Sequence, residues 1–240
     1  MLRTLCRALL TSALLALPAA ADQSDRIVFT FTLKGLTAGQ LSINGKIQSN
    51  SYGANGVMEA KGLLGALRTM RYDATVTGSY ANGRFTPQRF DETAQRGSDR
   101  FQYVTIYKGG TPVSVSRVPP RSPRPTDVDP AQQGGTIDPL TALYAVLRDV
   151  DRDEACKLSV FMYDGSKRTQ VSLSRPSPAG TGVTCAGEYR RIAGFSEREM
   201  KEKSLFPFTL TYAPTADGTR LQVVSIETDT ILGKGRLTRQ

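Results

Sequence analysis

One short segment constrains the fold more than any other, because it is the only convincing helix in a chain that otherwise shows the pattern of strands. It runs from Asp138 to Arg148. Asp138 can accept hydrogen bonds from the free backbone N–H groups of a helix N-terminus, and Pro139 suits the first helical position. Seven of the eight residues from Leu140 to Leu147 are apolar or aromatic, which predicts a helix covered by protein on several sides.

We therefore interpret the helix as a core plug, and the residues expected to form it are Asp138, Pro139, Leu140, Leu143, Tyr144 and Leu147. The alternative is that the same apolar surface forms the wall of a ligand site. A charge at Leu143 separates the two: loss of folding in Leu143→Asp supports the plug, and a stable, well-folded variant excludes it.

Most of the remaining chain alternates apolar and polar residues with the period of a half-buried strand, as in Ile27, Phe29 and Phe31. Asn82-Gly83 predicts a hairpin turn, because both residue types accept positive φ. Asn44-Gly45 and Asn55-Gly56 are ambiguous between a turn and an irregularity inside a strand. The pattern predicts a mainly β fold: about a dozen antiparallel strands in a curved sheet, open barrel or spiral around one principal α-helix.

The segment from Pro119 to Gly135 interrupts this pattern and holds five of the thirteen prolines. Structureless loops of this length are uncommon in compact domains and are often functional or disordered. We interpret it as a crossover that carries the chain to the helix. Residues 22–240 are then a single β-rich domain, with halves 22–118 and 136–240 joined by the proline-rich loop 119–135.

The first 21 residues have the three parts of a secretory signal: two arginines, an apolar run and a small-residue site. We expect cleavage between Ala21 and Asp22. The apolar run is too short to span a bilayer, and no later stretch of the sequence predicts a transmembrane segment. The mature chain is therefore expected to be soluble and periplasmic.

Charge and cysteine usage agree with export. The formal charge of +9 falls to +7 once the two signal arginines are removed. This favours anionic surfaces such as lipid headgroups, or only aids solubility, which is the simpler explanation. Nucleic acid is not expected as a partner outside the cytoplasm. Cys156 and Cys185 remain as an even pair, which predicts a structural disulfide in an oxidising compartment.

The sequence offers little for catalysis. It contains no histidine, which removes serine–histidine and cysteine–histidine mechanisms and histidine metal sites. Asp149, Asp151 and Asp153 superficially resemble a calcium loop, but the glycine and the later glutamate that such a loop needs are missing. Asp164-Gly165 is explained as a turn. We expect no catalytic residues, no metal and no cofactor, and the protein is predicted not to be an enzyme.

The chain resembles an uncharacterised family of exported bacterial proteins, domain of unknown function 3108. The residues that carry the resemblance are Asp138–Tyr144, Val160–Gly165, Cys185-x-Gly187-x-Tyr189, Gly194-Phe195 and Phe206-Pro207-Phe208, with Gly35, Ala38-Gly39, Gly62–Gly65 and Tyr72 in the first half. The resemblance implies a mostly β envelope protein without established catalytic residues. The family is also similar in architecture to the long curled sheets of periplasmic lipoprotein carriers and envelope-integrity factors.

Three functions follow as hypotheses. The first is a periplasmic binding or envelope-maintenance protein for an apolar or lipid-like ligand, with unknown ligand-binding residues. The second is a protein–protein scaffold that acts through strand edges or the loop 119–135, with an envelope protein as its partner. The third and most distant is a carboxylate-based hydrolase. A sealed core beside the helix favours the scaffold, and a roomy apolar cavity favours ligand binding.

Overall fold

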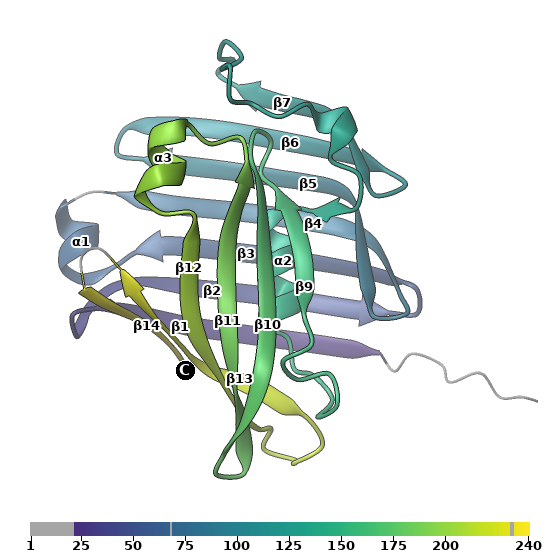
Figure 1. Ribbon diagram of the computed structural model, residues 1–240, viewed down its shortest axis with the longest axis vertical. Coiled ribbons are helices and arrows are strands. Elements are labelled where there is room, and N and C mark those ends of the chain that lie inside the picture. Colours follow the sequence, from purple (N-terminus) through teal and green to yellow (C-terminus); the bar gives the residue numbers. More distant parts are fainter. Residues whose placement is uncertain (1–21, 68, 231–232) are drawn as a thin grey trace, which may run out of the picture.

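The first seven strands lie side by side in the order in which they occur in the sequence (Figure 1). The computed structural model describes residues 22–67, 69–230 and 233–240, so the expected signal peptide falls outside the described residues. A short helix, α1 (Gly62–Leu67), connects the third strand to the fourth. The strands are β1 (Gln23–Leu33), β2 (Leu36–Gln48), β3 (Ser51–Ala60), β4 (Met70–Ala81), β5 (Arg84–Arg96), β6 (Asp99–Lys108) and β7 (Thr111–Val118).

The second part of the chain builds another meander. After the 3-10 turn η1 (Pro130–Gln132), the short strand β8 precedes helix α2 (Pro139–Leu147), and helix α3 (Glu197–Glu202) connects β11 to β12. The strands are β8 (Thr136–Ile137), β9 (Ser159–Tyr163), β10 (Arg168–Ala179), β11 (Gly182–Ala193), β12 (Leu205–Pro214), β13 (Leu221–Thr230) and β14 (Gly233–Arg239).

The two meanders form one continuous sheet because β1 pairs with β14, with Phe29 opposite Arg239. The pairs between neighbouring strands are antiparallel except β8 with β9. The sheet curls so that β9–β12 cross in front of β1–β6 in Figure 1, with α2 between the two layers. The mainly β fold with a helix inside a curved sheet is therefore confirmed. The one strand that the sequence pattern missed, β8, has two residues, too few for alternation to show.

The Asn82-Gly83 turn is confirmed: it joins β4 to β5 with φ of 52° and 74°. The other two Asn-Gly pairs are not turns. Asn44-Gly45 lies in regular pairing within β2, and Asn55-Gly56 lies in regular pairing within β3. Strand β10 includes the proline-containing segment Arg175–Pro178 and continues to Ala179 through a register shift after Ser174.

The two glycines explain how α2 packs on the sheet. A Cβ atom added to Gly45 would lie 2.2 Å from Cε2 of Tyr144, and one added to Gly56 would lie 2.6 Å from Cδ1 of Leu140. Side chains do not approach this closely, so the absence of a side chain at both positions lets the helix sit directly against β2 and β3. These glycines form a seat for the helix.

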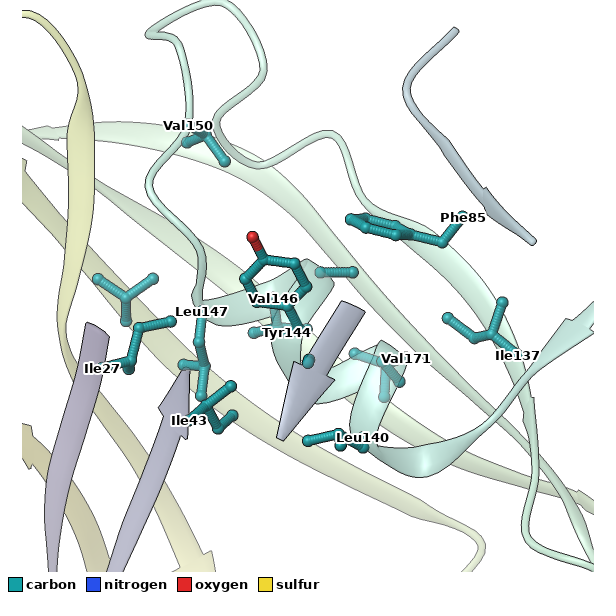
Figure 2. Close-up of a cluster of buried hydrophobic side chains, with 14 of the residues drawn as sticks. Ile27, Ile43, Phe85, Ile137, Leu140, Tyr144, Val146, Leu147, Val150 and Val171 are labelled. Carbon is teal, nitrogen blue, oxygen red and sulfur yellow. The ribbon is translucent and has the colours of Figure 1, made fainter. Parts of the chain in front are cut away.

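The core surrounds α2, as Figure 2 shows for Leu140, Tyr144 and Leu147 together with Ile27 and Ile43 of the first two strands. One expectation for the helix is wrong. Leu143 is 39% exposed, whereas the other residues from Leu140 to Leu147 are buried. Leu143 lies one turn after Pro139 on the helix surface that the sheet leaves uncovered, so the apolar composition of the helix overstated how much of it is enclosed.

Candidate ligand-binding cleft

The N-terminus of α2 is fixed by a buried capping group. Asp138 is fully buried, and its carboxylate accepts hydrogen bonds from the backbone N–H of Thr141 at 2.9 Å and from the Thr141 hydroxyl. The hydroxyls of Thr141 and Tyr52 lie 2.7 Å apart, which links the cap to β3. Burial raises the pKa of Asp138 to about 6, although the hydrogen bonds from Thr141 oppose the shift.

The C-terminal half of the helix is fixed to the first strand. The Tyr144 hydroxyl donates to Oδ2 of Asp25 at 2.6 Å, and Asp25 also accepts from the Gln23 side chain at 2.9 Å and from the backbone N–H of Asp149 at 3.3 Å. Burial raises the pKa of Tyr144 above its ordinary range, and the bond to Asp25 adds to the shift. Both ends of α2 are thus held by buried polar groups, as a structural plug requires.

The predicted disulfide is confirmed. Cys156 and Cys185 are bonded, both are buried, and the bond ties the segment before β9 to β11. The two cysteines are 29 residues apart in the sequence, and in the chain-entropy account closing a loop of this length stabilises the fold by about 3–4 kcal/mol.

The acidic segment after α2 forms ion pairs with a neighbouring and a distant arginine. Asp149 pairs with Arg239 at 3.1 Å, and Glu154 pairs with Arg148 at 2.7 Å. In the described part of the chain, no group of three or more metal-ligating side chains is placed to hold a metal ion. Among the same residues, no helix is both long enough and apolar enough to cross a membrane.

A cleft of about 830 Å³ opens beside the N-terminus of α2. Its walls are β4–β7, the crossover loop after β7, Pro139 at the start of the helix, and the turn between β9 and β10. This volume lies in the range of sites for small ligands. Aromatic and charged side chains share the lining: Tyr72, Phe90, Phe101, Tyr103 and Tyr163 with Glu92, Arg96, Arg117, Arg121, Arg124, Asp127 and Asp164.

Two of the arginines are held against aromatic rings. The Arg117 guanidinium carbon lies 4.6 Å from the ring centre of Phe101 and 5.7 Å from that of Tyr103, and its Nε donates to the Tyr103 hydroxyl at 3.1 Å. The Arg96 guanidinium carbon lies 5.5 Å from the ring centre of Tyr72, and its Nε donates to that hydroxyl at 2.9 Å. Cation–π contact and a hydrogen bond together fix the direction of each guanidinium.

The crossover loop is an ordered wall of the cleft. The Arg121 guanidinium donates two hydrogen bonds to the Asp127 carboxylate, at 2.6 Å and 3.0 Å, and the backbone N–H of Arg124 donates to the same carboxylate at 2.8 Å. These donors hold the pKa of Asp127 below its ordinary value. The backbone N–H of Val128 donates to the Ser166 carbonyl at 3.0 Å, so the loop is also tied to the turn after β9.

Two further groups in the cleft, the Glu92 carboxyl group and the Tyr163 hydroxyl, lie in surroundings that are unfavourable for polar groups. Burial raises the pKa of Glu92, and the nearby Asp164 raises it further, while Arg96 acts in the opposite direction. Tyr163 is almost fully buried, and its hydroxyl has no hydrogen-bond partner among the described residues. Groups of this kind are more common at binding sites than in purely structural cores.

Comparison with known proteins identifies the family and the architecture. The family described as "Protein of unknown function (DUF3108)" matches residues 28–178, more than half of the chain. The chain belongs to this family. A crystal structure of a beta-barrel-like protein of domain of unknown function DUF1849 from Brucella abortus is similar, with a TM-score of 0.50 and 12% identity, over 90% of this chain and 95% of that chain. No curated protein matches the sequence.

The match supports the resemblance seen in the sequence and also limits it. The helix start at Asp138–Tyr144 and the turn at Asp164-Gly165 lie within the part that matches DUF3108, as do all residues that line the cleft. The Cys185 motif and the Phe206–Phe208 motif lie beyond it. The likeness to the DUF1849 structure covers 90% of this chain, so it reaches into the second meander, and it shows the fold alone.

Sequence reasoning did not find the cleft of this DUF3108 protein. The residues singled out in the helix are structural, and only Pro139 reaches the cleft. The cleft combines residues from four consecutive strands, a loop and a distant turn, which no local motif reveals. A signal was present in β6 and β7, where Phe101, Tyr103 and Arg117 have the spacing that places them on one face of the sheet.

Proposed function

We propose that this DUF3108 protein is a non-catalytic binding protein of the cell envelope, and that its cleft and the adjoining face of the sheet hold an apolar, lipid-like chain. The observation that carries the proposal is an exposed apolar surface beside the cleft. Met58 lies directly opposite Tyr72 in the pairing of β3 with β4, and Met70 lies directly opposite Arg96 in the pairing of β4 with β5. Opposite residues in an antiparallel pair share a face, so both methionines border the cleft.

These side chains are exposed although they are apolar: Met58 is 47% exposed and Met70 is 41% exposed. Contiguous exposed apolar surface on a soluble protein marks a binding site, and methionine adapts its shape to varied ligands. We call Met58 and Met70 the methionine border.

The envelope location rests on two supports. The Cys156–Cys185 disulfide is stable in an oxidising compartment, and the first 21 residues have the pattern of a secretory signal. Fractionation of cells that produce the full-length chain tests this part. The mature protein is expected in the periplasmic fraction, and a full-length cytoplasmic product would contradict it.

The ligand part is tested with delipidated protein. We expect native mass spectrometry to show adducts of single-chain lipids, and a fluorescent fatty acid to bind and to be displaced by them. Replacing Met58 and Met70 together by glutamine removes apolar contact and is expected to weaken binding by about tenfold. Leu205→Gln is the matched control, because Leu205 is a similarly exposed apolar residue of β12 away from the cleft. Absence of both adduct and displacement would refute the lipid ligand.

One observation favours the scaffold as a second candidate. β7 is a terminal strand of the sheet, and it carries the exposed residues Val113 and Val118. Terminal strands can pair with another chain. If a partner recovered from envelope extracts is lost when residues 119–129 are replaced by a glycine–serine linker, the scaffold gains support; an unchanged set of partners counts against it.

A hydrolase has weaker support. Glu92 and Asp164 are carboxylates of the cleft, and Asp164 raises the pKa of Glu92, but Asp164 already accepts hydrogen bonds from the backbone N–H groups of Ser166 and Lys167 at 2.9 Å and 2.8 Å. These bonds hold Asp164 in the turn, as expected from Asp164-Gly165. We therefore retain the non-catalytic proposal.

A further inference from the structure

We propose that the cleft binds an anionic group of the phosphate or carboxylate class through Arg96, Arg117 and Arg124, so that the ligand of the methionine border is an anionic amphiphile. The lipid part of this statement rests on the proposed function above. The anion part rests on the cleft itself and can be tested separately.

The first step is the charge that the cleft leaves uncompensated. Arg121 is neutralised by its ion pair with Asp127. In the described ranges, no carboxylate forms an ion pair with Arg96, Arg117 or Arg124, although all three line the cleft. Glu92 lies close enough to Arg96, and Asp127 to Arg124, to interact electrostatically, but neither forms an ion pair with that arginine. Guanidinium groups that face a cleft without an ion-pair partner attract anions, and the low-dielectric walls strengthen the attraction.

The second step is preorganisation. Arg96 and Arg117 each use Nε for a tyrosine hydroxyl and stack on aromatic rings, so their orientation is fixed before a ligand arrives. The two terminal nitrogens of Arg96 and Nη2 of Arg117 have no hydrogen-bond partner in the described part of the chain. A planar fork of N–H donors matches the oxygens of a carboxylate or phosphate.

The third step concerns Glu92, the acidic group that would oppose an anion. Burial and the nearby Asp164 raise its pKa, whereas the nearby Arg96 lowers it. A buried carboxyl group beside a second carboxylate holds its negative charge less readily than a free one.

The fourth step joins head and tail. Arg96 lies opposite Met70, and Tyr72, on which Arg96 stacks, lies opposite Met58. The cationic side and the apolar side of the site therefore meet where Arg96 lies opposite Met70. An amphiphile can place its charged group at the arginines while its chain follows the methionine border.

The test compares four amphiphiles with the same twelve-carbon chain, dodecyl phosphate, dodecanoate, dodecyl maltoside and dodecyltrimethylammonium, below their micelle concentrations, with inorganic phosphate as a fifth probe. Isothermal titration calorimetry of the delipidated mature protein is expected to show that both anions bind at least about tenfold more tightly than the neutral and cationic compounds. A difference of this size corresponds to one charged hydrogen bond. Binding of inorganic phosphate alone would show that a free anion is the source.

Variants then assign the preference to the arginines. Arg96→Gln with Arg124→Gln is expected to lower the affinity for the two anions to that for dodecyl maltoside, while the affinity for the maltoside stays unchanged. Arg89→Gln is the matched control, because Arg89 is an exposed arginine of β5 that pairs with Asp91 and does not line the cleft. Arg117 is left intact because it also donates to the Pro119 carbonyl, so its loss could disturb the loop. Unchanged melting temperatures confirm folding.

The outcomes separate the two proposals. Equal affinity for all four amphiphiles, or an anion preference that survives in the double variant, overturns the anion site and leaves the lipid ligand standing. Binding of inorganic phosphate without any amphiphile supports the anion site and refutes the lipid ligand. Binding of none of the five probes overturns both.

Discussion

Tyr144 and Asp25 are 119 residues apart in the sequence, and a buried hydrogen bond of 2.6 Å joins them. This bond connects the central helix to the first strand. Asp25 lies opposite Gly45 in the pairing of β1 with β2, and the Tyr144 ring packs against Gly45. The same tyrosine therefore contacts Gly45 with its ring and Asp25 with its hydroxyl. The helix is therefore held by shape and by a polar contact at the same place.

We predict that Tyr144→Phe lowers the free energy of unfolding by about 1–3 kcal/mol, because the buried Asp25 carboxylate loses its tyrosine donor. Urea denaturation measures the change. Tyr107→Phe is the matched control: the Tyr107 hydroxyl is buried without a partner among the described residues, so its removal is expected to leave stability unchanged or to raise it. Equal losses in both variants would contradict the role given to the bond.

Gly45→Ala is expected to destabilise the protein by about 1–3 kcal/mol, since the added methyl group would overlap the Tyr144 ring. Gly53→Ala provides the comparison. Gly53 lies in the neighbouring strand β3, and a Cβ there meets its nearest atom at an ordinary 3.6 Å. Thermal melts of the two variants should differ clearly; similar melting temperatures would show that the helix does not depend on the seat.

The helix has one tolerant position. Leu140→Ala is expected to cost about 2–5 kcal/mol because Leu140 is only 3% exposed, whereas Leu143→Ala is expected to cost less than about 1 kcal/mol. Even Leu143→Asp should fold, so that substitution does not test the plug as the sequence suggested. Chemical denaturation of both alanine variants measures the two losses, and a larger loss of stability at Leu143 than at Leu140 would contradict this prediction.

Asp138 is expected to make the protein more stable in mild acid. Its pKa is about 6 when folded and 3.8 as an ordinary carboxyl, so between these values the folded state holds a proton that the unfolded state releases. The contribution is fully present below about pH 4 and is lost as the pH rises through 6, with a maximum of about 3 kcal/mol.

Asp138→Asn keeps the cap and cannot titrate, which makes it the reference. Urea denaturation of both proteins from pH 4 to pH 7 should show the wild type losing stability relative to the variant. A difference that stays constant with pH would exclude a raised pKa at Asp138.

Removal of the disulfide in Cys156→Ala with Cys185→Ala is expected to lower stability by about 3–4 kcal/mol. Wild-type protein in reductant should approach the variant, and reductant should not affect the variant. If reduction leaves the denaturation midpoint of the wild type unchanged, the bond does not stabilise the fold.

How much the sequence could predict depended on how local the cause was. The Asn82-Gly83 turn and the Asp138 cap are decided by neighbouring residues, and both were predictable. Asn44-Gly45 and Asn55-Gly56 have the residue types of a turn, but the role of the two glycines depends on a helix more than eighty residues later. Nothing local distinguishes a glycine that bends the chain from one that makes room for a distant ring.

The cleft was out of reach for the same reason. Arg96, Arg117 and Arg124 are ordinary polar residues of strand ends and a loop when considered singly. They become a group only because antiparallel pairing brings successive strands together and the crossover loop folds back over them. Leu143 shows the converse error, in which composition was taken as burial although position on the helix decides it.

The pairing of β1 with β14 has a consequence for the order of folding. The turns between successive strands allow each meander to form from residues close in sequence, but the seam at the centre of the sheet needs β1 and β14 together. Until residues 233–239 are available, β1 remains an open edge that can pair with another chain. Strand β14 thus protects β1 from pairing with another chain and from aggregation.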